Sequence, residues 1–155
     1  MCTLIKQRSV IAIEYKIISD FTYYNEYCEL YKKWHPRSTK PPIAKPWHPS
    51  INTWFILKRP AMNDLKQKWK SYIVWLVRKH GLENLQIEHC EITYRFYMPT
   101  TRRADIDNYS PKFAQDGLTE AGVIIDDDYK HVNPLHIELY YDKENPRMEI
   151  IIKVK

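Results

Sequence analysis

Glycine is the residue whose scarcity most restricts the folds open to this chain, because it occurs only 3 times in 155 residues. Loops that cradle nucleotide phosphates need glycine, since a backbone without Cβ atoms lets the phosphates approach closely. Neither a GxGxxG nor a GxxxxGK[ST] string occurs in the sequence. Both loop types are therefore excluded, and we expect neither a Rossmann nor a P-loop enzyme, and no nucleotide cofactor.

The chain has the length of one domain and the composition of a folded protein. Apolar residues make up 44% and charged residues 28% of it, away from the profile of disordered chains. Cys2, Cys28 and Cys90 lack the spacing of a zinc site, and no signal peptide or membrane-spanning run is visible. We predict a single domain over residues 1–155 in a reduced, intracellular (cytoplasmic) protein that does not associate with a membrane.

Apolar periodicity predicts a mixture of strands and helices. Alternating or β-branched apolar runs predict strands, and apolar residues three and four apart predict helices. A turn at 142–146 predicts that the last two strands pair as a C-terminal hairpin. The fold class is α+β, with a mixed, mostly antiparallel sheet and two main helices. The predicted strands are 10–18, 51–57, 90–98, 135–141 and 148–154, and the predicted helices run from Asn63 to Gly81 and from Ser110 to Gly122.

Residues 19–50 show no clear period. Their tyrosine-rich first part, FTYYNEYCELYKKW, is predicted to be a loop or a short helix. The second part holds five of the ten prolines, which interrupt helices and strands alike. We expect a proline-rich arm or insertion at about 28–50.

Charge is distributed unevenly along the chain. The 24 basic and 19 acidic residues give a net charge of +5. Residues 105–128 hold seven acidic residues and one lysine, so this acidic segment carries −6 and the rest of the chain +11. A basic protein suits a polyanionic partner. The acidic segment therefore calls for a separate explanation.

The acidic segment contains two carboxylate clusters. Asp105 and Asp107 follow a predicted strand, and in extended backbone such residues point to the same side. Asp126, Asp127 and Asp128 follow the short helix, an excursion that commonly returns a chain beside its starting strand. Clustered carboxylates repel unless a cation neutralises them, and oxygen ligands without His or Cys favour Mg²⁺ or Mn²⁺. We predict a divalent metal site, in preference to the alternative that one cluster caps a helix and the other forms a surface turn.

Lys112 is the one base within the acidic segment. At the start of the short helix it is placed either to lean over the carboxylates and stabilise charge on a phosphate or an attacking water, or to pair with Asp116 one helical turn later. Spacing alone favours neither arrangement.

The run RRADIDNYSPKFAQDGLTEAGVIIDDDYKHV resembles the RusA-like crossover-junction endodeoxyribonucleases, which are often encoded by phages. Their signature is Asp-x-Asp-Asn, then a lysine, then Asp-x-Leu, then Asp-Asp before a strand. The resemblance is close over about 30 residues and looser from Ile87 to the C-terminus. It implies a homodimeric, Mg²⁺-dependent nuclease that resolves four-way DNA (Holliday) junctions by paired nicks in recombination and repair.

The resemblance also implies roles for individual residues. The family's catalytic lysine corresponds to Lys112, although Pro111 stands where some members place it. The implied catalytic carboxylates are Asp105, Asp107 and Asp127, and the implied metal ligands are these three with Asp126.

Contacts to DNA are expected beside these carboxylates. The family has an Asn-containing loop after its first strand, and Asn25 in TYYNEY competes for that place with Asn52 in PWHPSINTW. Asn25 is preferred because it directly follows the first predicted strand. The residues expected to contact DNA are Arg102, Arg103, Lys130, Asn25 and Asn108.

Two other functions remain open from the sequence. One is a DNA-binding architectural protein whose carboxylates only organise a turn. The other is a metal-dependent nuclease or phosphatase that acts on RNA, nucleotides or other nucleic acids.

Overall fold

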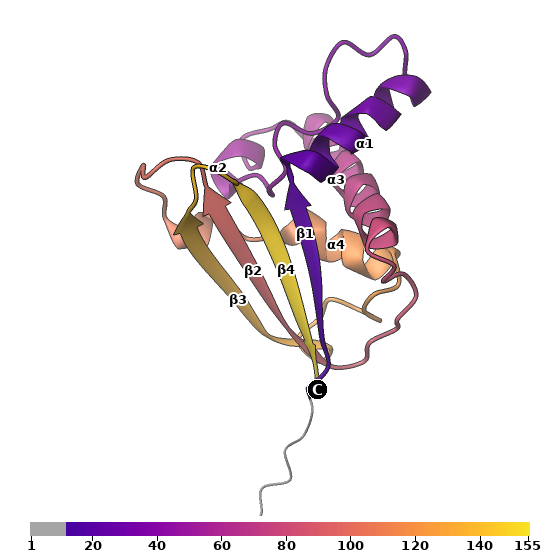
Figure 1. Cartoon of the computed structure of the whole chain (residues 1–155), viewed down its shortest axis with the longest axis vertical. Helices are drawn as coiled ribbons and strands as arrows, with labels where there is room; N and C mark the ends of the chain where they lie inside the picture. The colour runs from indigo at the N-terminus through magenta and orange to yellow at the C-terminus, as the bar shows by residue number, and fades with distance from the viewer. Residues whose placement is uncertain (1–11) are drawn as a thin grey trace, which may run out of the picture.

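A computed structural model describes residues 12–155, in which helices and strands are interspersed along the chain (Figure 1). In chain order the elements are β1 (Glu14–Asp20), α1 (Phe21–Trp34), α2 (Ile51–Trp54), α3 (Arg59–Lys79), β2 (Cys90–Met98), the 3₁₀ turn η1 (Ile106–Asn108), α4 (Lys112–Glu120), β3 (Val132–Tyr141) and β4 (Arg147–Val154).

Within residues 12–155 the strands form one sheet of four, in the order β1-β4-β2-β3. β4 lies antiparallel between β1 and β2, and β2 pairs in parallel with β3. The predicted α+β class with a mixed, mostly antiparallel sheet is confirmed. The first strand starts at Glu14 rather than Val10, and Val10 and Ile11 lie outside the described residues.

The predicted C-terminal hairpin is wrong, because β2 lies between β3 and β4. β4 buries the five consecutive residues 148–152, on both faces of the sheet. A strand that is buried on both faces is most stable in the middle of a sheet, where it pairs with a strand on each side. β3 is instead connected to β2 through α4, the kind of crossover that a parallel pair requires.

The helices α3 and α4 pack against each other on one face of the sheet (Figure 1). The predicted helix 63–81 starts earlier, at Arg59, where Pro60 is tolerated in the first turn, and it stops before Gly81, whose φ is +68°. The buried residues of these helices are Trp69, Tyr72, Ile73, Leu76 and Val77 in α3, and Phe113, Ala114, Gln115, Gly117 and Leu118 in α4.

Gly117 marks the closest approach of α4 to α3. A Cβ atom added at Gly117 would lie 2.6 Å from the Cβ of the fully buried Ile73, so the two helices would have to shift. We expect Gly117→Ala to lower the free energy of unfolding by about 1–2 kcal/mol, because overpacking costs about 1–3 kcal/mol and the better helix propensity of Ala returns at most about 1. Urea denaturation measures this loss. Ser71→Ala, at an exposed position of α3, is the control, and an equal effect of the two variants would contradict the close contact.

The tyrosine-rich segment after β1 is a helix of 14 residues, longer than predicted. The Asp20 carboxylate caps its first turn by accepting the Tyr23 N–H at 3.0 Å. Its buried residue is Tyr27, whose ring centroid lies 5.1 Å from that of Trp75 on α3. The helix is difficult to predict because its buried face depends on this contact with a distant part of the chain.

Residues 51–57, predicted to be a strand, form α2 and a turn. The Ile51 carbonyl accepts the Phe55 N–H at 2.8 Å, which is a helical contact. Aromatic and β-branched residues favour a strand only where a sheet can receive them. Here Phe55 and Ile56 are 73% and 80% exposed, and no strand lies beside them among the described residues.

Residues 35–50 join α1 to α2 without regular structure, so the irregular arm begins later than the predicted residue 28. The arm is nevertheless packed. Ile43 and Trp47 are buried, and the Ile43 carbonyl accepts the Tyr24 hydroxyl at 2.8 Å. The arm therefore holds a defined position beside the two helices α1 and α3.

None of the helices within residues 12–155 combines the length and apolar character needed to cross a membrane.

Candidate active site

The first carboxylate cluster lies in the connection from β2 to α4. The backbone of Asp105 is extended, but residues 106–108 form the turn η1, which the Asn108 N–H closes on the Asp105 carbonyl at 3.1 Å. Asp107 thus lies in the turn and not in the predicted extended backbone, and the convergence of Asp105 and Asp107 on one cation stays a prediction.

The second cluster forms a turn directly before β3. Asp128 is engaged by this turn, because its Oδ1 accepts the N–H groups of Lys130 and His131 at 3.1 and 3.2 Å. The same oxygen lies 2.5 Å from Nδ1 of His131, and this hydrogen bond lowers the pKa of Asp128. Asp128 therefore fits the alternative to a metal site, in which the second carboxylate cluster forms a surface turn.

Asp127 has different surroundings. Desolvation, a hydrogen bond with Asp126 and the negative charge of Asp116 raise the pKa of Asp127. Its charge also adds to the effect of burial in raising the pKa of Tyr94, in the middle of β2. A carboxylate among other acids, close to a buried strand, is stabilised when a cation is bound beside it.

The chain returns from α4 to place β3 beside β2, as predicted. Within residues 12–155, a close group of metal-ligating side chains is formed by Asp126, Asp128 and His131, with ligand atoms all within 4.8 Å of one another. Sequence reasoning missed His131, although its spacing of three from Asp128 was a signal. The first cluster does not belong to this group, and its convergence with Asp127 on one cation stays a prediction.

The donor atoms of the second cluster fit a hard divalent cation. Asp126 and Asp127 supply carboxylate oxygens, the ligands that Mg²⁺ and Mn²⁺ prefer. Nδ1 of His131 is already hydrogen-bonded to Asp128 and is not free to bind a metal in this arrangement.

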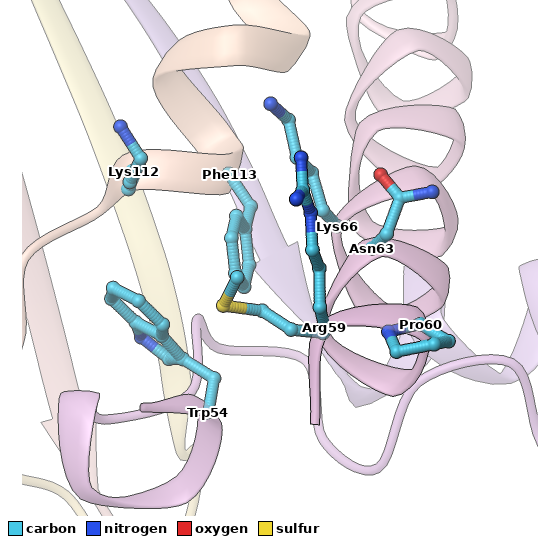
Figure 2. Close-up of a pocket in the computed structure, with 8 residues that line it drawn as sticks. Trp54, Arg59, Pro60, Asn63, Lys66, Lys112 and Phe113 are labelled. Carbon is cyan, nitrogen blue, oxygen red and sulfur yellow. The ribbon is translucent and has the colours of Figure 1, made fainter. Parts of the chain in front are cut away.

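Lys112 is exposed on the first turn of α4 and lines a pocket there (Figure 2). Its alternative partner, Asp116, pairs with Lys66 of α3 instead, with Nζ 3.4 Å from Oδ2. No ion pair involves Lys112 within residues 12–155. Of the two arrangements that spacing left open for Lys112, the ion pair with Asp116 is therefore not formed, and the ammonium is available to a phosphate.

His48 of the arm holds the start of α4, a role that sequence reasoning missed. Its Nε2 accepts the Phe113 N–H at 3.0 Å, and its Nδ1 lies 2.8 Å from the Pro49 carbonyl oxygen. Because a carbonyl only accepts, Nδ1 carries the proton and the imidazole is neutral. Ser110, where the predicted helix begins, does not cap α4, which has no side-chain cap. The sequence offered no periodic signal for this contact, which joins residues 65 positions apart.

Burial lowers the pKa of His48 to about 4, below the ordinary value of 6.5. The unfolded chain therefore binds a proton at His48 that the folded chain does not, and stability should fall as the pH drops from about 6.5 towards about 4. At pH 5 we expect a loss of about 2 kcal/mol relative to neutral pH from this residue, at about 1.4 kcal/mol per pH unit.

Urea denaturation at pH 7.5 and pH 5 measures the effect. His48→Gln keeps a side chain that can accept the Phe113 N–H but does not titrate, and it should reduce the pH dependence by that amount. An unchanged pH dependence in this variant would show that other groups cause it.

The residues expected to contact DNA lie on the surface, apart from Asn108, which is half-buried in η1. Arg103 places its Nε 3.5 Å from Oδ1 of Asp105, so it accompanies the first carboxylate cluster. Asn25 is exposed on α1 and Asn52 on α2. The three basic residues are exposed and lie in segments without regular structure: Arg102, Arg103 and Lys130.

A comparison with protein families finds that the model for Endodeoxyribonuclease RusA matches residues 46–153. A comparison with curated proteins finds no match. The family match contains both carboxylate clusters, Lys112 and Asn52, whereas Asn25 lies before it. Asn25 therefore lies outside the matched range and Asn52 inside it, and the assignment of the family's loop asparagine stays a prediction. Since the match covers most of the chain, the protein belongs to the RusA family of endodeoxyribonucleases.

Proposed function

We propose that this protein is a Mg²⁺-dependent endodeoxyribonuclease that resolves four-way DNA junctions by paired nicks. One observation carries the proposal: the RusA match contains the Asp-x-Asp-Asn motif, Lys112 and the second carboxylate cluster in a single continuous stretch. The charge of the chain supports a DNA substrate, because the residues outside the acidic segment carry +11.

The carboxylates of Asp105, Asp107 and Asp127, with Asp126 beside them, hold the metal. Bound Mg²⁺ activates a water molecule and stabilises the oxygen that leaves the phosphate. The acidic segment, at −6, repels the DNA backbone that the rest of the chain attracts. Neutralisation of these carboxylates therefore favours DNA binding as well as hydrolysis.

The basic residues near these carboxylates bind phosphates. Lys112 projects from the first turn of α4, where the helix dipole also favours negative charge, and it neutralises the phosphate that is cut. Arg102, Arg103 and Lys130 contact the flanking phosphates, which position the DNA without reading its sequence.

Paired nicks in a symmetric junction need two active sites related by a two-fold axis, which a homodimer supplies. Light scattering should therefore give about twice the 18.8 kDa mass of one chain. A monomeric mass with and without junction DNA would contradict paired nicking by a dimer.

The test is cleavage of a mobile four-way junction in Mg²⁺ and in EDTA, with the products mapped on all strands. We expect symmetric nicks on two strands, in Mg²⁺ only. Duplex DNA, single-stranded DNA and RNA compete in parallel reactions. Binding without cleavage would indicate an architectural protein, and preference for another competitor would reject the junction as substrate while keeping the nuclease assignment.

A further inference from the structure

A pocket of about 570 Å³ lies where α2, the start of α3 and the first turn of α4 meet (Figure 2). Its volume is that of a typical small-ligand site, which spans about 300–1,000 Å³. It borders Lys112, the lysine assigned above to the phosphate that is cut. The lining residues are Trp54, Arg59, Pro60, Met62, Asn63, Lys66, Lys112 and Phe113.

One part of the pocket is aromatic and apolar. The ring centroids of Trp54 and Phe113 lie 5.2 Å apart at an angle of 54°. Phe113 is buried in the core, so its ring is held in place, and Met62 adds a further apolar side chain to the pocket lining. Nucleobases stack on surfaces of this kind, whichever base they are, because every base has a π-face.

The other part of the pocket is cationic. The charged ends of Arg59, Lys66 and Lys112 point to the same side in Figure 2, away from Trp54. None of the lining residues is acidic. Lys66 forms an ion pair with Asp116, whereas Arg59 and Lys112 form no ion pair within residues 12–155. The pocket therefore combines unpaired positive charge with an aromatic wall.

A ligand that matches both parts carries a negative charge next to a flat ring, and a nucleotide unit of DNA has this chemistry. Resting on the proposed function, we propose that this pocket binds an unstacked nucleobase of the junction, next to the phosphate that is cut. The base stacks on Trp54, and its own phosphates lie against Arg59 and Lys112. Unstacking a base costs least where it is already poorly paired, as at the centre of a junction.

The experiment measures junction binding in EDTA by fluorescence anisotropy, with a series of junctions that each lack one base near the crossover. For the wild-type protein we expect one abasic position to weaken binding about tenfold, the scale of a single base–aromatic stack. Trp54→Ala should weaken binding of the intact junction by a similar factor. The abasic change should then have no further effect on Trp54→Ala, because both changes remove the same contact.

A charge test keeps the inference falsifiable if Trp54→Ala does not fold. Arg59→Gln should weaken binding several-fold and lower the salt dependence of log K by about one unit of slope. Arg78→Gln removes the same charge from the exposed far end of α3 and should change binding less than twofold. Equal effects of the two arginine variants would overturn the inference.

The failures of the two proposals are distinguishable. If the wild-type protein neither binds nor cuts the junction, both are overturned. If it binds and cuts the junction while Trp54→Ala, Arg59→Gln and the abasic series leave binding unchanged, only the nucleobase pocket is overturned, and an acidic segment of a partner protein becomes the better occupant.

Discussion

Asp105→Asn is expected to abolish junction cleavage, with the rate in Mg²⁺ falling at least about a thousand-fold. The substitution keeps the size of the side chain but removes the negative charge that a divalent cation requires. Metal activation of water and of the leaving oxygen is worth several kcal/mol, and each 1.4 kcal/mol is about a factor of ten in rate. Asp105 is more than half exposed, so the fold should persist. Single-turnover cleavage measures the rate, and circular dichroism checks the fold.

Asp64→Asn is the matched control. Asp64 is also exposed and paired with a nearby base, Lys68 at 2.8 Å, but it lies on α3 outside both carboxylate clusters. Its loss should leave the cleavage rate within about twofold. Comparable losses in the two variants would attribute the effect to net charge and contradict a metal-ligand role for Asp105.

The same assay separates the members of the second cluster. Asp127→Asn should also abolish cleavage, since its carboxylate lies among other acids and is stabilised by a cation. Asp128→Asn should retain cleavage, because the Asp128 side chain closes the turn and bonds His131. The reverse result would assign the metal to the group of Asp126, Asp128 and His131.

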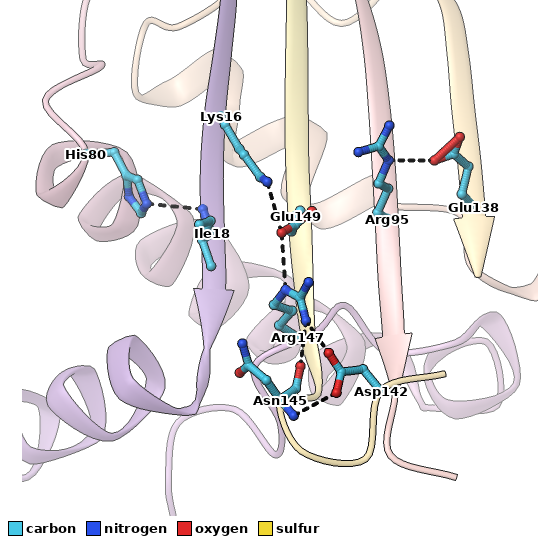
Figure 3. A network of polar contacts seen from close by, with 9 residues as sticks. All are labelled: Lys16, Ile18, His80, Arg95, Glu138, Asp142, Asn145, Arg147 and Glu149. Carbon is cyan, nitrogen blue, oxygen red and sulfur yellow. Dashed lines mark hydrogen bonds and ion pairs between the residues drawn. The ribbon is translucent and has the colours of Figure 1, made fainter. Parts of the chain in front are cut away.

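Arg147→Met is expected to lower the free energy of unfolding by about 3 kcal/mol. Arg147 joins the turn before β4 to the sheet (Figure 3): it contacts Asp142 at 2.8 Å and the buried Glu149 at 3.1 Å. Its guanidinium also lies 3.7 Å from the centre of the Tyr97 ring. Removing one partner of a buried ion pair costs about 3–5 kcal/mol, and Glu149 keeps a second partner, Lys16, at 3.1 Å. Urea denaturation measures the loss.

Arg95→Met is the matched control, because Arg95 lies opposite Glu149 on β2 and pairs with Glu138 at 2.7 Å (Figure 3). Both members of this pair are more than a third exposed, so its loss should cost less than about 1 kcal/mol. Similar losses in the two arginine variants would show that burial does not strengthen the Arg147 contacts.

Acid sensitivity gives a second measurement on the Arg147 network. Burial by itself raises the pKa of Glu149, but hydrogen bonds from Lys16 and Arg147 outweigh it, so the pKa of Glu149 is lowered. A lowered pKa adds stability above the unfolded value of about 4.3, and that stability is lost as the pH falls below it. Arg147→Met should therefore lose less stability than the wild-type protein between pH 5 and pH 3.

The elements that follow a clear apolar period were predicted well. β2 has the predicted bounds of 90–98, and the stripe from Trp69 to Val77 faces the core. Prediction was wrong where neighbours decide the conformation. Residues 51–57 have strand-like composition but lack a sheet edge to join, and β4 leaves its sequence neighbour β3 to pair with β1 and β2.

The candidate site likewise has a part that the sequence predicted and a part that it did not. The Asp-x-Asp-Asn motif, the lysine after it and the second carboxylate cluster identify the family from local sequence alone, because their chemistry depends on residue type and spacing. The sequence also indicated that a helical excursion returns the chain beside β2, and it does.

Tertiary structure alone decided how the first turn of α4, which carries Lys112, is held. His48 reaches α4 from the irregular arm and bonds the Phe113 N–H, and Trp54 and Arg59 come from two other elements to form the pocket beside Lys112. No local period connects these residues, because each contact is made by packing between segments far apart in the chain. The sequence thus determined the chemistry of this nuclease, and the packing of the arm, α2 and α3 around α4 decided the geometry in which that chemistry is presented.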